Sequence, residues 1–592
     1  MRKVRFGLVA CLAIAACSSA EDHSGTQAAA DDENAAIAGP GKADSPFSAC
    51  QVSAALLRAS DPSLDKDALR AAGVHSRAAT QIAKAKAGAD GTLGTEDDVA
   101  FHTLEELDAV PWVGPAALRQ LAAPSAAHCA LVPVPEAAPI FSPRATRDES
   151  HLARAEQLID SATSNVDIAM YSFSDSGIQA AIGRAVQRGV RVRFIYDPAG
   201  AEAKSPAGTR SAALEALGAD VRFVNKIMHH KFMIVDGPHD DVDSALSATL
   251  LTGSGNWSGS AGTRYDENTV ELRGEVRLTL RFQKEFNHLW ENSRDFDAGA
   301  GFQPAASLPI GDWMLLSDPE ASVAFTSANF DVFSNNLGPG FSVVAGRNEV
   351  ADRLVELIQN AETSIWIASG HLRSRPVSEA LIAKVAQSPG LDVRVYLDGQ
   401  EYVSAYTSQS EADDQAACVS AAGSSESKLQ ACYDKAFHWS YPVATTDGIQ
   451  LRFKHYSYRW HYSYAPQMHH KYMLVDGTVL ASGSYNLSDN AEHQTMENMV
   501  VYRGDRHAGL TQAFADNFEG MWSTGEAAGS FQTLLNEVKN GSGTVPIVYD
   551  AMALTHAQVT ELKAAIRDAC PEVDSQEFRV HPQKHMTCKR SP

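Results

Sequence analysis

Two short stretches of the chain carry the residues that could do chemistry, and the two are nearly the same. Residues 228–237 and 468–477 are identical at eight of ten positions, and each runs Met-His-His-Lys at its start and Val-Asp-Gly at its end. A histidine imidazole can act as a nucleophile or transfer a proton near neutral pH, and a lysine ammonium can stabilise developing negative charge. The repeat therefore predicts two copies of one half-site, each with a histidine and a lysine.

Alternation along a strand selects one histidine of each pair. Side chains two residues apart share a face of a strand, so the first histidine lies with the lysine, while His230 and His470 face the other way and are expected to pack. An Asp-Gly turn signal follows each lysine, and then come a Ser-x-Asn pair and a glutamate, thirteen residues after the serine in both copies. The five polar residues of each copy are His229, Lys231, Ser254, Asn256 and Glu267, and His469, Lys471, Ser484, Asn486 and Glu497.

His-x-Lys-x4-Asp followed by Gly-Ser-x-Asn, present twice, resembles the phospholipase D superfamily over roughly residues 145–525. The resemblance implies a phosphodiesterase in which one imidazole attacks phosphorus, giving a phosphohistidine, and the other protonates the departing oxygen. It implies His229 as the nucleophile and His469 as the general acid, although the residues alone leave their order open. Both histidines come from one chain, so the active site is expected to be complete in a monomer.

The same resemblance implies roles for the other residues. The groups expected to hold the phosphate oxygens, with the serines in support, are Lys231, Lys471, Asn256, Asn486, Ser254 and Ser484. Glu267 and Glu497 would orient the histidines through the second ring nitrogen, as a triad carboxylate does. Asp236 and Asp476 would be structural residues at the turns. No metal or other cofactor is expected at the reactive centre, because the lysines supply the positive charge.

Helical and strand-like segments alternate in the same order around both motifs. The helical patterns cover 152–162, 178–188, 350–361 and 377–387, and the strand-like runs 166–171, 190–196, 365–368 and 393–397. This order predicts an α/β fold of two duplicated lobes, residues 145–300 and 310–525, each a mixed sheet flanked by helices, forming one pseudo-twofold unit. Residues 526–592 form a C-terminal extension without a recognisable motif.

The two copies differ in their insertions. The first copy has about ten extra residues after Gly237, and the second has a long insertion between Asp398 and His469. The long insertion contains an aromatic run, residues 455–464, which we interpret as a rim or lid over the site; ordinary surface packing is the alternative.

The first residues are typical of an export signal. Residues 1–17 have a basic start and an apolar stretch of about eleven residues, which is too short to span a bilayer. The stretch ends in Ile-Ala-Ala-Cys, which resembles a bacterial lipoprotein cleavage box with Cys17 as the lipidated residue; an ordinary secretory leader is the alternative. We expect a protein anchored to the cell envelope, in the periplasm or on the outer face, with residues 18–45 as a flexible linker.

Export makes disulfides the expected state of the remaining cysteines. Proximity within the expected domains predicts three pairs, with free buried thiols as the alternative: Cys50–Cys129, Cys418–Cys432 and Cys570–Cys588. None of the six has metal-ligand spacing.

Residues 46–131 are expected to form a small helical domain. Residues 107–118 resemble a helix-hairpin-helix, in which a glycine turn lets backbone amides approach a phosphate, although a plain helical packing module is the alternative. Asp90, Asp97 and Asp98 cluster around glycines and would suit a structural Ca²⁺ loop, because hard cations take oxygen ligands. A solvated acidic turn is the alternative.

Charge and anchoring bear on the substrate. The formal net charge of −22 is unfavourable for general binding to a polyanion, and a lipid anchor would hold the chain at a membrane surface. The predicted substrate is therefore a phospholipid head-group phosphodiester, hydrolysed or transferred. An exported nuclease acting on DNA or RNA by the same chemistry is the alternative, and a non-catalytic binding protein on the same scaffold is a third reading.

Overall fold

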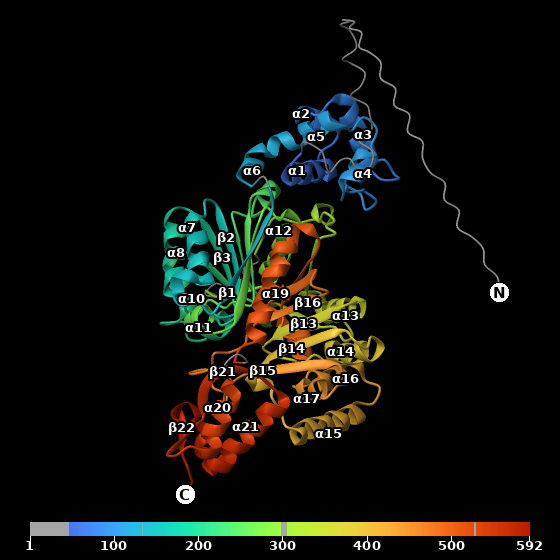
Figure 1. Ribbon diagram of the computed structural model, residues 1–592. Coiled ribbons are helices and arrows are strands. Elements are labelled where there is room, and N and C mark those ends of the chain that lie inside the picture. Colours follow the sequence, from blue (N-terminus) through green and yellow to red (C-terminus); the bar gives the residue numbers. More distant parts are fainter. Residues whose placement is uncertain (1–46, 133, 298–304, 526–528, 592) are drawn as a thin grey trace, which may run out of the picture.

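The computed structural model describes residues 47–132, 134–297, 305–525 and 529–591 (Figure 1). The predicted leader, Cys17 and the linker at 18–45 lie outside the described residues. Within the described ranges, no helix is long and apolar enough to cross a membrane.

Two eight-stranded mixed sheets form the body of the molecule, and their strands follow the same spatial order. The first sheet runs β1 (Glu136–Ser142), β8 (Glu267–Arg273), β7 (Thr249–Gly253), β6 (Lys231–Val235), β2 (Asn165–Met170), β3 (Arg191–Tyr196), β4 (Asp220–Phe223) and β9 (Arg294–Asp295). The second runs β10 (Ala321–Phe325), β19 (Asn498–Tyr502), β17 (Val479–Gly483), β16 (Lys471–Val475), β13 (Ser364–Ser369), β14 (Asp392–Asp398), β15 (Ile449–Ser457) and β21 (Val548–Thr555). The predicted duplication of α/β lobes is confirmed.

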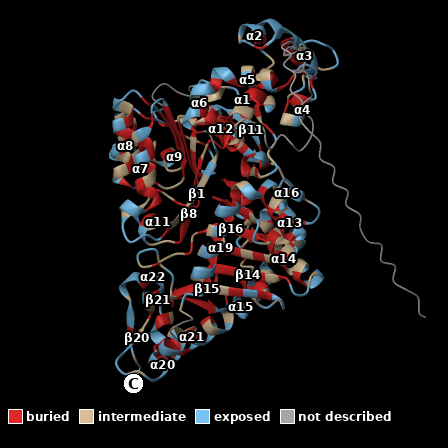
Figure 2. Ribbon diagram, turned by 45° about the horizontal axis from the view of Figure 1, so that its top comes forward, coloured by how far each residue is buried: buried red, intermediate tan, exposed pale blue. Residues whose placement is uncertain are grey.

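Helices cover the sheets where the apolar spacing predicted them. In lobe one these are α7 (His151–Ser161) and α8 (Ser176–Gln187), and in lobe two α13 (Glu349–Asn360) and α14 (Arg375–Gln387). Their buried sides face the strands and their exposed sides face solvent, as the banded helices of Figure 2 show. Side chains cap the starts of α7 and α8: Ser150 accepts a hydrogen bond from the Leu152 amide, and Asp175 from the Ile178 amide.

One hydrophobic core joins the lobes. It contains the apolar faces of α12 (Val276–Glu291) and α19 (Ala508–Trp522), together with side chains from strands of both sheets. The aromatic side chains of this shared core include Phe232, Phe282 and Phe286 from lobe one and Tyr472 and Phe514 from lobe two. Because large apolar surfaces of both lobes are buried together, the two halves are held in a fixed relation.

The N-terminal helices pack against lobe one through its insertion. They run from α1 (Ala49–Ser60) to α6 (Ala126–Leu131), and the Cys50–Cys129 disulfide joins the first to the last. A short helix in the insertion, Val242–Leu246, places Ala245 and Leu246 in the core of this helical unit. The ten extra residues after Gly237 are thus a docking element.

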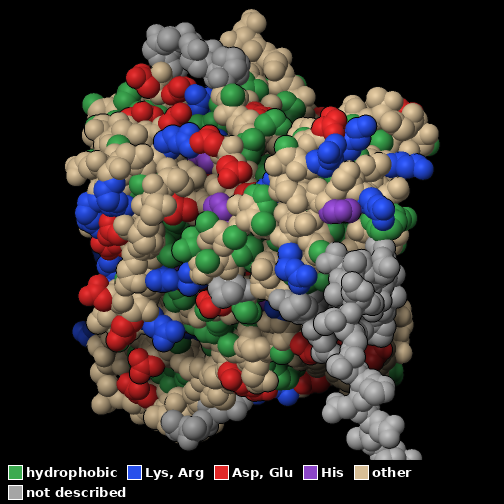
Figure 3. Space-filling view, turned by 90° about the horizontal axis from the view of Figure 1, so that it is seen from above, with side chains coloured by type: hydrophobic (Ala, Val, Ile, Leu, Met, Phe, Trp, Pro, Cys, Tyr) green, Lys and Arg blue, Asp and Glu red, His purple; other side chains and the backbone are tan. Residues whose placement is uncertain are grey.

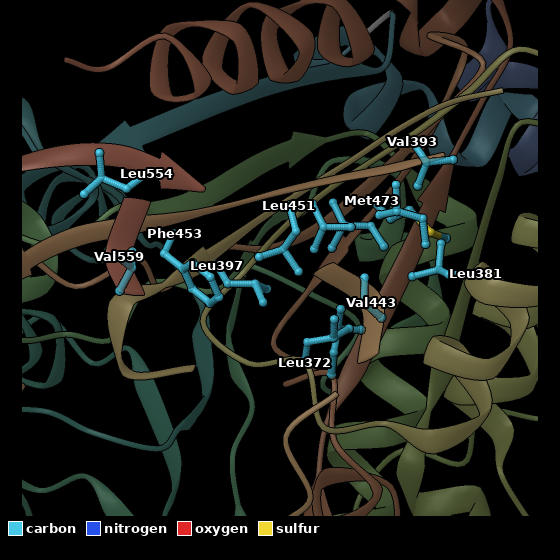
Figure 4. Close-up of a cluster of buried hydrophobic side chains, with 14 of the residues drawn as sticks. Leu372, Leu381, Val393, Leu397, Val443, Leu451, Phe453, Met473, Leu554 and Val559 are labelled. Atoms are coloured by element: carbon cyan, nitrogen blue, oxygen red, sulfur yellow. The ribbon is translucent and has the colours of Figure 1, made fainter. Parts of the chain in front are cut away.

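The C-terminal extension completes lobe two. Strand β21 pairs with β15, and Leu554 and Val559 enter the same core as Leu397 and Phe453 (Figure 4). Helices α20 (Ser530–Asn540) and α21 (His556–Ala569) follow, and the Cys570–Cys588 disulfide holds the end of the chain. The extension is therefore part of the fold of lobe two.

The predicted aromatic lid is wrong for the first half of the run. Residues 449–457 form β15, a strand inside the sheet, and both Tyr456 within the strand and Tyr458 directly after it are buried. Only Trp460 and Tyr462, in the loop after the strand, are exposed, at 38% and 63%. Residues 453–458 are all buried, and Tyr458 belongs to the hydrophobic core of lobe two.

The third expected disulfide is also present. Cys418–Cys432 joins α15 (Ala405–Ala422) to α16 (Glu426–Tyr433) within the long insertion. The alternative of free thiols is excluded for all six cysteines, and three disulfides fit an oxidising, exported environment.

Candidate active site

The two histidine motifs meet at the seam between the lobes. In lobe one, β5 (Ile227–Met228) pairs in parallel with β18 (Thr495–Met496) of lobe two, and the His229 amide donates to the Met496 carbonyl at 3.0 Å. The mirrored contact joins the His469 amide to the Asp266 carbonyl at 2.9 Å. Each histidine segment is therefore hydrogen-bonded to the chain just before the other lobe's glutamate.

The glutamates are exchanged between the lobes. Nδ1 of His229 lies 2.7 Å from Oε1 of Glu497, and Nδ1 of His469 lies 2.8 Å from Oε1 of Glu267. Both carboxylates are completely buried. The sequence predicted that these glutamates orient the histidines, and in the structure each lies against the histidine of the opposite lobe.

Each lysine lies against the histidine of its own lobe. Lys231 Nζ donates to the His229 carbonyl at 2.6 Å and lies 3.1 Å from Nδ1 of the ring. Lys471 Nζ donates to the His469 carbonyl at 2.8 Å and lies 3.2 Å from both ring nitrogens. His229 and His469 lie just before β6 and β16, and the two-residue spacing in this extended segment brings each histidine to the same side as its lysine, as expected.

Burial shifts the protonation equilibria of the whole cluster. It lowers the pKa of Lys231 to about 7 and that of Lys471 to about 8, and it raises the pKa values of Glu267 and Glu497 to about 7. Burial and the neighbouring lysines also hold the pKa values of both histidines well below 6.5. The imidazoles are therefore mainly neutral before an anion enters, which is the form that can attack phosphorus.

The Ser-x-Asn pairs lie beside this cluster and divide into two roles. Ser254 Oγ accepts from the Asn268 amide at 2.9 Å and Ser484 Oγ from the Asn498 amide at 3.0 Å, so the serines fasten the segments that carry the glutamates. The asparagines differ from the serines, because Oδ1 of both Asn256 and Asn486 is buried without a hydrogen-bond partner among the described residues.

The second histidine of each pair directly precedes β6 or β16, and its side chain is buried among other partners. His230 lies 3.1 Å from Oε1 of Glu285, and its Nδ1 accepts from the Asn498 side chain at 3.0 Å. His470 Nδ1 lies 3.0 Å from Oδ1 of Asn268. The contacts with Asn498 and Asn268 cross between the lobes, so both histidine side chains help to join the halves.

The motif aspartates lie at turns away from the histidines. Asp236 and Asp476 have left-handed backbone conformations, with φ of 50° and 55°. Their carboxylates accept hydrogen bonds from backbone amides that lead into β2 and β13, among them Ser164 at 2.7 Å and Thr363 at 2.6 Å. This geometry fits the structural role that the resemblance implied.

Sequence reasoning missed a pair of supporting aspartates. Asp197 directly follows β3 and Asp398 is the last residue of the matched strand β14. Their carboxylates accept hydrogen bonds from the amides of Met228 and Met468, each at 2.8 Å. They fix the residue just before each first histidine. Their signal was present in the sequence, because both follow a β-rich run at the same place in the repeat.

The two walls of the site differ. In lobe one, the ring centroids of Tyr171 and His229 are 4.4 Å apart. Lobe two has Gly370 at the matching position, because the Tyr171 and Gly370 amides each donate to the carbonyl of the second histidine of their own lobe. One residue further, lobe two carries His371, whose Nδ1 lies 2.9 Å from the buried carboxylate of Glu401, which also binds Arg373. The sequence comparison of the two motifs did not reveal this asymmetry.

The N-terminal candidates lie in the helical unit, apart from this cluster. Asp97 accepts from the amides of Ala89 and Asp90, and Asp98 from that of Gly94, so these carboxylates close their own loop. No group of three or more His, Cys, Asp or Glu side chains in the described ranges is arranged to hold a metal ion. The helix-hairpin-helix segment consists of α4 (Leu104–Asp108) and α5 (Pro115–Ala122), joined by a turn.

Comparisons with known proteins agree with the geometry. A family model described as "Cardiolipin synthase, PLD-like domain" matches residues 156–290 and 354–522, just over half of the chain. Mitochondrial cardiolipin hydrolase of Drosophila melanogaster is 31% identical over 152 residues, covering 24% of this chain and 58% of that protein; the protein of the same name from Canis lupus familiaris is 32% identical over 177 residues, covering 28% and 64%. The chain thus spans about three-fifths of the length of these relatives.

Among solved structures, Nuc from Salmonella typhimurium, described as a phospholipase D family member, matches with 27% identity and a TM-score of 0.22, covering 27% of this chain and 97% of that one. Phosphatidylserine synthase from Haemophilus influenzae matches with 12% identity and a TM-score of 0.41, covering 64% and 85%.

Proposed function

The chain belongs to the family described as cardiolipin synthase, PLD-like domain, and from this premise we propose that it is a phosphodiesterase of the phospholipase D type that acts on the head-group phosphodiester of a phospholipid. The observation that carries the proposal is the crossed arrangement of His229 with Glu497 and His469 with Glu267, beside two buried lysines. Two imidazoles, each with Nδ1 held by a carboxylate, are suited to attack and to proton transfer in one site.

The first step forms a bond between Nε2 of His229 and phosphorus while the bond from phosphorus to the leaving alcohol oxygen breaks. Glu497, at Nδ1, stabilises the positive charge that develops on the ring. Protonated His469 gives its proton to the departing oxygen, so that the head-group alcohol leaves neutral. The substrate's negative charge favours the protonated form of His469, because it offsets the repulsion from the lysines.

The second step reverses these roles with water as the acceptor. His469, now neutral, removes a proton from water as the water oxygen bonds to phosphorus, and the bond from phosphorus to Nε2 of His229 breaks. An alcohol in place of water would give transfer instead of hydrolysis. Lys231, Lys471 and the side-chain amides of Asn256 and Asn486 stabilise the phosphate oxygens in both steps.

Three features favour a lipid over a nucleic acid. The curated relatives are named cardiolipin hydrolases, which makes cardiolipin the first lipid to test. The net charge is −22, and basic and acidic side chains of the described residues are interspersed on the face seen in Figure 3. A broad basic field, which polyanion binding requires, is not visible there.

The nuclease remains the second candidate because of one local feature. The turn between α4 and α5 presents Trp112, which is 41% exposed, with the Arg77 guanidinium 4.3 Å from its ring centre. An exposed aromatic ring with an arginine is suited to stacking on bases of a single strand.

We further propose that the chain is exported and lipid-anchored through Cys17. The three disulfides support export, and the anchor rests on the cleavage-box resemblance. Mass spectrometry of the mature N-terminus tests it: a diacylglyceryl-cysteine at residue 17 is expected, and an unmodified N-terminus would refute it.

One experiment separates the candidate functions. Purified protein is given vesicles of cardiolipin or phosphatidylcholine and, separately, plasmid and single-stranded DNA, each with and without a chelator. Head-group release that persists with chelator supports the lipase with lysines as its charge source. Cleavage of DNA without lipid turnover would replace it with the nuclease, and binding without turnover of either would favour a non-catalytic scaffold.

A further inference from the structure

A polar cavity lies in lobe two, outside the histidine cluster. It has a volume of about 350 Å³ and is bounded by the ends of β14 and β15 and by the C-terminal extension. Its lining includes Gln400, Arg459 and Trp460 from the lobe, and Lys563 and Arg579 from the extension. It therefore joins two parts of the chain that the phosphodiester chemistry does not use: the loop after the aromatic strand and the C-terminal extension.

The cavity is positively charged in an otherwise acidic protein. Three cationic side chains line it, and the carboxylate beside them, Asp574, is already shared between Arg459 at 2.9 Å and Arg567 at 2.6 Å. Burial and the charges of these two arginines lower the pKa of Lys563 to about 8. An anion in the cavity would relieve this repulsion.

Two hydrogen-bond donors at the cavity are unsatisfied. Nε2 of Gln400 and Nε of Arg459 are both buried with no acceptor among the described residues. A buried donor without a partner costs stability, and a ligand that supplies the acceptor recovers it. A phosphate offers several acceptor oxygens, so each of these donors can bind a different oxygen.

From the charge, the unsatisfied donors and the volume of the cavity, we infer that this cavity is a binding site for a phosphate group, separate from the candidate active site. The inference does not rest on the proposed function, because none of its residues takes part in the histidine chemistry. It would hold equally if the substrate were a nucleic acid.

A short structural link connects the cavity to the histidine cluster. Asp398 accepts the Gln400 amide at 2.8 Å through one carboxylate oxygen and the Met468 amide at 2.8 Å through the other. Met468 directly precedes His469. A phosphate held by Gln400 would therefore steady the loop that fixes the position of His469.

The phosphate could come from solution or from a lipid head group. Trp460 and Tyr462 lie exposed in the loop at the cavity, and such aromatic side chains suit the boundary between water and an apolar phase. Both sources offer the same chemistry, so the two arms of the experiment distinguish them.

The first arm is a calorimetric titration of the full chain with inorganic phosphate. Lys563→Gln and Arg579→Gln should each weaken one binding event by about tenfold or more, the loss of one charge-assisted contact. Arg579 is exposed, so its variant should fold normally. Lys539→Gln is the matched control, because Lys539 lies on the same extension in an exposed pair with Glu561 and should leave the titration unchanged.

The candidate active site can also bind phosphate, so the titration is repeated with Lys231→Ala and Lys471→Ala combined. The event assigned to the cavity should persist in this variant and disappear when Arg579→Gln is added. An isotherm that neither Lys563→Gln nor Arg579→Gln changes, or a signal lost entirely with the two active-site lysines, would overturn the inference.

The second arm is sedimentation with phosphatidylcholine vesicles that contain or lack phosphatidylglycerol. If the cavity takes a lipid phosphate, the anionic vesicles should retain the wild type and Lys539→Gln better than Arg579→Gln. If Arg579→Gln loses phosphate in the first arm but sediments like the wild type, the ligand is free phosphate. Both results support the site and assign its source.

Discussion

Replacing Glu497 by glutamine tests the crossed histidine pairs. At the 2.7 Å separation of Glu497 Oε1 and His229 Nδ1, a carboxylate stabilises positive charge on the ring by up to about 6 kcal/mol at an effective dielectric constant of about 20. Glutamine keeps an acceptor but removes the charge, so part of this stabilisation should be lost. We expect kcat to fall on the order of 10²–10⁴-fold, or about 3–5 kcal/mol in barrier.

The assay compares two synthetic phosphodiesters, one with an alkyl leaving group and one with p-nitrophenolate. Nitrophenolate leaves without protonation, so a defect in the general acid should be largely rescued by it, and a defect in the nucleophile should not. Glu497→Gln should therefore behave like His229→Ala and remain slow on both substrates. Glu267→Gln should behave like His469→Ala and recover on the activated substrate in the initial burst of nitrophenolate, which reports the first step alone, because the second step still needs His469 as the base for water.

The grouping of variants is decisive even if the order of the two histidines is reversed. Crossed pairing requires Glu497→Gln to share its pattern with His229→Ala, whichever step that histidine performs. If Glu497→Gln grouped with His469→Ala instead, each carboxylate would serve its own lobe and the crossed arrangement would be wrong. A loss below threefold in both glutamine variants would show that the carboxylates do not orient the rings.

Three further outcomes follow from the structure. Lys231 and Lys471 must be protonated to stabilise phosphate, so kcat/KM should fall as pH rises through about 7 to 8, where their pKa values lie; a constant value to pH 9 would contradict this. His470→Ala should lower the free energy of unfolding in urea by about 2–4 kcal/mol, because it leaves a cavity and removes the contact with Asn268 Oδ1, while kcat of the folded protein stays within about tenfold. Leu554→Ala should cost about 2–5 kcal/mol and lower the melting temperature of lobe two, whereas an unchanged melting temperature would mean that the extension folds apart from it.

Local spacing made the half-sites predictable. His229 and Lys231 lie on one side because they are two residues apart in an extended segment that leads into β6, and this holds wherever the segment lies in the fold. The turn at Asp236 is equally local, since its carboxylate caps the amides beside it. Duplication added a check, because a pattern that recurs with the same spacing cannot easily arise from the composition of one segment.

Long-range packing made the remaining features unpredictable. The thirteen-residue spacing from serine to glutamate is the same in both lobes, so it cannot show which histidine Glu497 reaches; only the packing of the shared core decides that. No pattern in the sequence around β15 indicates that β21 is its partner strand. Arg452 and Thr555, which pair between the two strands, are about a hundred residues apart in the chain. The aromatic run was misinterpreted for the same reason, because its burial depends on that distant partner strand.

The asymmetry of the site walls follows from joining both half-sites in one chain. In a symmetric dimer, identical sequences would force identical surroundings on both histidines. Here Tyr171 lies against His229, while His469 faces Gly370, where a Cβ atom would lie 2.9 Å from the Met468 carbonyl oxygen. A phosphodiester also has two different sides, the part that leaves and the part that stays on phosphorus. Unequal walls can bind these sides differently, so we expect the direction of attack to be set by Tyr171 and Gly370, because the two histidine motifs themselves are almost the same.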